Sequence, residues 1–433
     1  MDFGVIAINF DGWKLVELSL KHSSLKHLWK KRKCLPKLEV INLGNSQQLM
    51  ECPNLSFAPR VELLILDGCT SLPEVHPSVT KLKRLTILNM KNCKILHYFP
   101  SITGLESLKV LNFSGCSKLD KFPEIQGSRE VSGNHGGYGM FTKASFRWNI
   151  YKELPPSIVY LKGLQSLSLR KCKNFTSLPN SICSLRSLET LIVSSCSKLS
   201  KLPEDLGGVV KDQHLTPGFH PFYSDLSGCN LTDRSINDNL GHLRFLEELN
   251  LSRNNLVTVP EESPQYLSSS SCLRPVTFKL PNCFALAQDN VATILGKLHQ
   301  NFLPEIEYSI VLPRSKIPEW FQHPSIGSSV TIELPPNWHN KDFLGFALCS
   351  VFSLEEDEII QGPGLICCNF EFKEGPYLSS SISWTHSGDR VVETDHIWLV
   401  YQPGAKLMIP KSSASISSGR LQLILVSLGH PMW

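Results

Sequence analysis

The cysteines are the first residues that suggest chemistry, because the chain of 433 residues contains 14 of them. A thiolate can exchange disulfides or bind zinc, and both uses favour cysteine pairs separated by two residues. The sequence contains no such pair. Six cysteines recur instead at one position of a repeated pattern, where a small buried apolar side chain is needed: Cys69, Cys93, Cys116, Cys172, Cys196 and Cys229. Their spacing predicts a structural role.

Three other features could support chemistry. The glycine-rich residues 127–139 could cradle a phosphate, but no Gly-Lys-Ser/Thr follows them. The acidic run Glu355 to Glu358 could hold a cation, but nothing nearby supplies complementary ligands, so a solvated hairpin loop is favoured. The histidines show no metal-binding spacing. We therefore expect no catalytic, cofactor-binding or metal-binding residues, and no enzyme activity.

Charge gives a similarly mild signal. The net charge is +4, which argues against nucleic acid as the main partner. The basic run Lys30 to Lys33 fits a nuclear-import signal, an anion contact or a solvated turn between repeats. The N-terminus lacks the basic start of a signal peptide, and the apolar run 421–428 is too short to span a bilayer. These features predict a cytoplasmic or nucleo-cytoplasmic protein without a transmembrane segment.

The elements behind the cysteine spacing are leucine-rich repeats. The cleanest copy has apolar residues at offsets 0, 3, 5, 8, 11 and 14 from Leu188, followed by Pro203. Neither the helix period nor the strand period fits this pattern, whereas a short strand, a buried turn and a returning arc do. Copies start every 23 or 24 residues from Leu15 to Leu108. This regularity predicts a solenoid, in which each repeat packs against its neighbours.

The array is predicted to occupy residues 1–265 with about ten repeats. It is irregular at 127–150, read as a disrupted repeat or loop, and at 207–224, which carries turn residues. The first repeat already looks like one from the middle of an array. Either residues 1–14 form an unusual cap, or the natural array continues upstream.

The pattern changes after the array. Residues 266–303 are expected to form a junction with a capping helix over 284–302. From residue 304 to 433, short alternating apolar runs are separated by Pro, Gly and Ser clusters, which favours an antiparallel β-sandwich. The predicted fold class is an α/β leucine-rich-repeat solenoid followed by an all-β jelly-roll/Ig-like sandwich.

Several motifs carry a family resemblance. Leu154-Pro-Pro-Ser-Ile158 and Leu178-Pro-Asn-Ser-Ile182 are similar to repeats of plant TIR-NBS-LRR disease resistance proteins, the class of the tobacco mosaic virus resistance protein N. Ile317-Pro-Glu-Trp-Phe321, residues 327–338 and Asp395-His-Ile-Trp398 resemble the jelly-roll/Ig-like domain (C-JID) that follows the repeats in that class. The resemblance covers roughly residues 13–430.

The resemblance implies only part of the family's activity. A TIR domain is absent, as is the GxxxxGK[ST] motif of the nucleotide-binding module, so the NADase and nucleotide switch are not carried over. The implied function is recognition of a pathogen effector and autoregulation within an intracellular immune receptor. A full-length or helper receptor is a further candidate partner. The alternatives are a truncated receptor that acts as a decoy or has no function, and a protein-binding adaptor.

Binding in a solenoid is expected on the concave face, where the residues between the core leucines emerge. The patch reads as mixed and mostly polar, which suits a protein partner. The candidate residues are Asn89, Lys91, Asn92, Ser168, Arg170, Lys171, Ile192, Ser194, Glu248, Asn250 and Arg253.

Overall fold

We analysed a computed structural model of the chain. It describes residues 13–29, 33–102, 104–119, 122, 125, 153–200, 202–203, 222–236, 246–257, 276–283, 307–313, 316–319, 321–327, 329–334, 343, 345–352, 364–372, 379–386, 395–403 and 419–428. The chain divides into two compact units, Met1–Leu246 and Glu247–Trp433. Each unit is described by itself.

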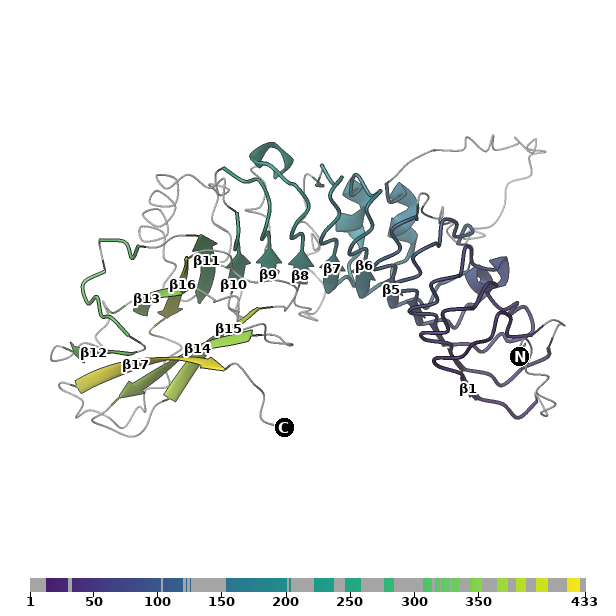
Figure 1. The fold of residues 1–433 in the computed structure, drawn as a ribbon, viewed down its shortest axis with the longest axis horizontal. Coiled ribbons are helices and arrows are strands. Elements are labelled where there is room, and N and C mark those ends of the chain that lie inside the picture. The colour runs from purple at the N-terminus through teal and green to yellow at the C-terminus, as the bar shows by residue number, and fades with distance from the viewer. Residues whose placement is uncertain are drawn as a thin grey trace, which may run out of the picture. The chain divides into compact units, whose positions relative to one another are not determined.

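The first unit is a ladder of short parallel strands, each paired with the next (Figure 1). The register places the central residues of successive strands opposite one another, as in Leu18↔Ile41 and Leu64↔Leu88. This is the parallel sheet of a leucine-rich-repeat solenoid, as predicted. The strands are β1 Glu17–Ser19, β2 Val40–Asn42, β3 Leu63–Ile65, β4 Ile87–Asn89, β5 Val110–Asn112, β6 Ser166–Ser168, β7 Thr190–Ile192 and β8 Phe222–Asp225.

The leucine spacing explains why these strands form. In β2, β3, β4, β5 and β7 the central residue is buried and its two neighbours are half-buried. Alternating side chains point to opposite faces of a strand, so one leucine per strand enters the core and two residues face outward. The chain returns through irregular arcs and short 3-10 helices, η1 Pro77–Lys81, η2 Pro156–Tyr160, η3 Asn180–Ser184 and η4 Asp233–Ser235, which lie on the side away from the strands (Figure 1).

The recurring cysteines are structural, as their spacing predicted. Each thiol donates to a carbonyl oxygen of the preceding repeat at 3.1 to 3.3 Å, from Cys69 to Leu43 through Cys229 to Val193. Ser46 occupies the same position in the second repeat, and its hydroxyl donates to the Leu20 carbonyl at 3.0 Å. Burial raises the pKa of Cys69 and of Cys229 to about 12, so these two thiols stay protonated and are poor nucleophiles.

The irregular segment after β5 does not interrupt the ladder. β5 pairs directly with β6, with Leu111 opposite Leu167. On the arc side, Phe113, Phe122 and Phe175 pack edge to face with ring centroids less than 6 Å apart. The stretch read as a disrupted repeat or loop, 127–150, lies outside the described residues.

β8 begins inside the second stretch predicted to be irregular, 207–224. It pairs in parallel with β7, with Ser224 opposite Leu191. Ser224 is fully buried and occupies the position that leucine holds in the other strands. Because serine stands at this position, the leucine spacing does not predict β8.

The second unit begins with three further parallel strands, β9 Leu246–Asn250, β10 Val276–Lys279 and β11 Tyr308–Pro313. β10 lies within residues 266–303, the predicted junction. The predicted capping helix, 284–302, lies outside the described residues. Cys283 continues the thiol pattern after β10, because its thiol donates to the Leu251 carbonyl at 3.3 Å.

β11 is parallel to β10, whereas the other pairings described after residue 304 are antiparallel, as the alternating pattern predicted. β11 pairs with β16 His396–Pro403, which pairs on its other edge with β13 Gly345–Phe352. A separate four-stranded sheet has the order β12-β17-β14-β15. Its strands are β12 Ser329–Leu334, β17 Gly419–Leu428, β14 Gly364–Phe372 and β15 Ser379–His386.

β16 is the most buried strand described, since all eight of its residues are buried. Two of its polar side chains have specific hydrogen-bond partners. The Trp398 indole N–H donates to the Ser309 hydroxyl at 2.9 Å, and the backbone N–H of Asn282 donates to His396 Nε2 at 2.9 Å. Side chains of β16 therefore form hydrogen bonds with both β11 and the turn that follows β10.

Candidate protein-binding face of the repeat array

The candidate site is the strand face opposite the leucine core. Two residues per strand emerge there, on either side of the buried central residue. Registered pairing sets these residues in rows that run across the strands. One row is formed by the first residue of each strand and a second by the last.

The first row changes character along the array. It is apolar and half-buried on four consecutive strands, and polar or aromatic on the next three at Ser166, Thr190 and Tyr223. The four apolar residues, which we call the apolar row, are Val40, Leu63, Ile87 and Val110.

Some predicted contact residues are occupied in forming the turn after each strand. The Asn89 and Asn250 side-chain oxygens each accept the amide N–H two residues later, at 3.1 Å. The same turn occurs at Asn42, Asn112 and Asp225. Such local bonds fix the turn and leave these side chains less able to contact a partner.

Three predicted residues occupy one special backbone position. Asn92, Lys171 and Arg253 have φ values of 57° to 60°, each three residues after the end of its strand. The equivalent Gly68 and Gly115 also have positive φ, and a Cβ there would collide with the side-chain oxygens of Asn45 and Asn92 respectively. Asn92 and Lys171 are exposed, so they are positioned by the turn and remain accessible.

The predicted serines are buried. Ser168 is 7% exposed and its hydroxyl shares a 2.6 Å hydrogen bond with the Ser114 hydroxyl, while Ser194 is 2% exposed. Lys91 is exposed and Arg170 and Ile192 are half-buried. The structure therefore leaves Lys91, Asn92 and Lys171 as the most accessible of the predicted residues in the first unit.

Glu248 lies in the second unit, where it forms an ion pair with Lys279. Glu248 Oε1 and Lys279 Nζ are 2.6 Å apart, and Lys279 is largely buried. The two residues occupy neighbouring strands, β9 and β10. Lys279 was missed because its strand lies within the predicted junction. The partial burial of both groups makes this pair part of the fold as well as of the surface.

Among the described residues, no group of three or more His, Cys, Asp and Glu side chains could hold a metal ion. A search of the same residues finds no helix long and apolar enough to cross a bilayer.

Comparison with known proteins gives two domain matches. Residues 312–424 match the C-JID domain, and residues 104–305 match the leucine-rich repeats of "Disease resistance protein RPS4B-like". The C-JID match covers the segment in which the Ile317 to Phe321 motif was noted.

Whole-chain relatives are plant proteins. The TMV resistance protein N of Nicotiana glutinosa is 31% identical over 421 residues, covering 78% of this chain and 37% of that protein. The disease resistance-like protein DSC1 of Arabidopsis thaliana is 28% identical over 505 residues, covering 92% of this chain and 40% of that protein. The disease resistance protein RPS4B of Arabidopsis thaliana is 28% identical over 441 residues, covering 91% and 34%. The chain thus spans 34% to 40% of the length of these relatives.

Proposed function

The chain is a homologue of plant disease resistance proteins and carries their C-JID domain and leucine-rich repeats. From this premise we propose that it recognises a pathogen effector protein in plant immunity. The observation that carries the proposal is the strand face of the first unit. It combines a half-buried apolar row with exposed cations such as Lys91 and Lys171. Protein–protein interfaces have this composition, with an apolar centre and a polar rim.

The proposed action is binding without catalysis by this chain. The thiols that sequence reasoning flagged are held in the core, with a pKa raised by burial. The relatives are much longer, so signalling by the whole protein is proposed to need segments beyond those that this chain matches. A full-length or helper receptor is the second partner that this proposal implies, in a cytoplasmic or nucleo-cytoplasmic setting.

The C-JID segment is proposed to be a jelly-roll/Ig-like sandwich. Its antiparallel strands form two separate groups, β11-β16-β13 and β12-β17-β14-β15. Strands of this kind bury their apolar faces by packing two sheets together.

The test is split-luciferase complementation in leaves between the chain and a panel of secreted pathogen effectors. We expect at least one effector to give a signal that Lys91→Glu reduces at least fivefold. Lys81→Glu is the matched control, because Lys81 is exposed on η1, away from the strand face. An effector signal that is equally reduced by both variants, or by neither, would contradict recognition through the strand face.

A further inference from the structure

The apolar row has a defined length and direction. Val40, Leu63, Ile87 and Val110 lie directly opposite one another on adjacent strands. Neighbouring strands are about 4.8 Å apart, so the row extends roughly 14 Å across the sheet. Ile65 lies beside it at the end of β3 and is also half-buried. The row ends at Glu17 on one side and Ser166 on the other.

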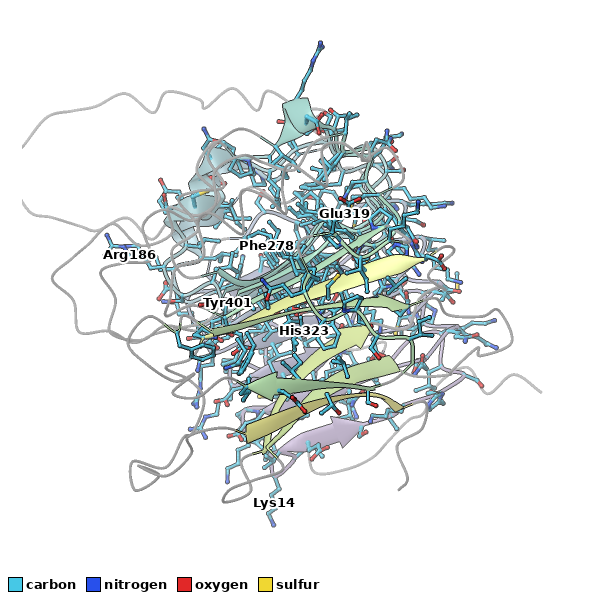
Figure 2. All side chains as sticks on the ribbon, turned by 90° about the vertical axis from the view of Figure 1, so that its left-hand side faces the viewer. Lys14, Arg186, Phe278, Glu319, His323 and Tyr401 are labelled. Carbon is cyan, nitrogen blue, oxygen red and sulfur yellow. The ribbon has the colours of Figure 1, made fainter. Side chains whose placement is uncertain are left out.

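A second row, of cations, overlaps the apolar row in three repeats, because the apolar row lies on β2 to β5 and the cations precede β1 to β4. A turn precedes each strand, and its last residue is a cation in repeats one to four: Lys14, Lys37, Arg60 and Arg84. All four are exposed, and Figure 2 shows the Lys14 side chain extending away from the ribbon. The equivalent residues of the next repeats are Ser107, Gly163 and Ser187. We call these four cations the basic turn row.

The charge of this region is distinct from that of the whole chain. Residues 13–106 contain 14 Lys and Arg against seven Asp and Glu, whereas the entire chain has a net charge of only +4. Exposed Lys21 and Lys91 lie at the opposite ends of the strands from the basic turn row. The carboxylates of Glu39 and Glu62 precede the apolar row by one residue, and Arg84 pairs with Glu62 at 2.6 Å. Asp67 holds the position after β3 that Lys21 and Lys91 hold after β1 and β4, so the excess of positive charge lies on the basic turn row.

From these rows we propose that the first five repeats bind an acidic amphipathic helix of a partner protein. The helix would place its apolar face on the apolar row and its carboxylates against the basic turn row. This inference rests on the proposed protein-binding function of the strand face and names the chemistry of the bound segment.

The spacing selects a helix over an extended segment. A helix repeats its apolar side chains about every 5.4 Å along its axis, so three turns cover the row. Side chains on one face of an extended segment recur about every 6.7 Å, which matches the spacing of about 4.8 Å between neighbouring strands less well than the helical repeat does. Nucleic acid fits less well, because the apolar row would gain nothing from contact with phosphates.

The experiment uses two synthetic helical peptides with the same leucine face, one flanked by glutamates and the other by lysines. Binding to the full chain is measured by fluorescence anisotropy. We expect the glutamate peptide to bind at least tenfold more tightly. Leu63→Asn should weaken its binding at least tenfold, whereas Met50→Asn, at an exposed apolar residue on the arc side, should not.

A charge reversal separates docking from folding. Lys37→Glu combined with Arg60→Glu alters only exposed side chains and should reverse the preference in favour of the lysine peptide. Equal affinity of the wild-type chain for both peptides would overturn the proposal, as would binding that ignores both sets of changes. Self-association of the chain that Leu63→Asn abolishes would also overturn it, because the row would then bind a second copy.

The two proposals fail in different ways. If the chain bound both peptides equally but still gave a luciferase signal with an effector, only the acidic-helix inference would be wrong. Peptide discrimination without any effector signal would instead remove the proposed effector recognition.

Discussion

The two units of the chain hold their strands in different ways. In the first unit one set of contacts is repeated, with a buried leucine or isoleucine at the centre of each strand except β8 and a thiol or hydroxyl that bonds to the preceding repeat. In the second unit β16 is held by contacts that occur once, between Trp398 and Ser309 and between Asn282 and His396. Repetition spreads stability along an array, because each repeat contacts only its neighbours, whereas single contacts concentrate it.

The largest expected effect is loss of a core leucine in the repeats. Leu191 is fully buried in β7, so Leu191→Ala should cost about 2–5 kcal/mol of unfolding free energy through the cavity it leaves. Arg170→Ala, on the outward face, should cost much less. Thermal and urea unfolding of both variants measures the difference, and equal losses would contradict the assignment of inner and outer faces.

A smaller loss is expected in the second unit. Ser309→Ala would leave the buried Trp398 N–H without its acceptor, which should cost about 1–3 kcal/mol. Unfolding followed by tryptophan fluorescence is the measurement. The control is Ser325→Ala, at an exposed serine whose hydroxyl bonds to the Ser329 carbonyl. If the two variants lost the same stability, the single-contact description of β16 would be wrong.

The smallest effect is a pH dependence in η1. Burial lowers the pKa of His76, whose Nδ1 accepts from the Ser78 N–H and lies 2.8 Å from the Ser78 hydroxyl, while the Glu74 carboxylate opposes the shift. Because the folded pKa lies below the unfolded value of about 6.5, the unfolded state binds the proton more readily. The neutral His76 therefore contributes stability to the folded state that is fully present above the unfolded pKa and is lost as the pH falls through the folded pKa.

His76→Asn should flatten that dependence. Melting temperatures of the wild type and the variant between pH 7.5 and 5 provide the comparison. An identical slope for both proteins would show that another group controls the acid sensitivity of the array.

The repeated contacts are also the ones that a sequence reveals. Leucines and cysteines at fixed offsets predicted the parallel ladder, because each repeat must bury the same positions. The pattern failed where one residue departed from it, as at Ser224 in β8. It also missed β10, whose Cys283 was the available signal.

The candidate face was less predictable for a different reason. Alternation indicates which residues point outward, but it does not say how deeply they lie. Ser168 and Ser194 therefore proved to be buried, whereas Lys91 and Lys171 are exposed. The contacts of His396 and Ser309 join segments far apart in the chain, and no local pattern encodes such pairs.

The central claim is that the strand face of the first repeats contacts the protein partner. Hydroxyl-radical footprinting of the chain, with and without an effector that gives a luciferase signal, tests it most directly because it reads side-chain exposure. We predict that labelling of Leu63 and Ile87 falls on binding, while labelling of Met50 and Tyr160, exposed on the arcs, does not change. Protection of Met50 and Tyr160 with Leu63 and Ile87 unchanged would contradict the account.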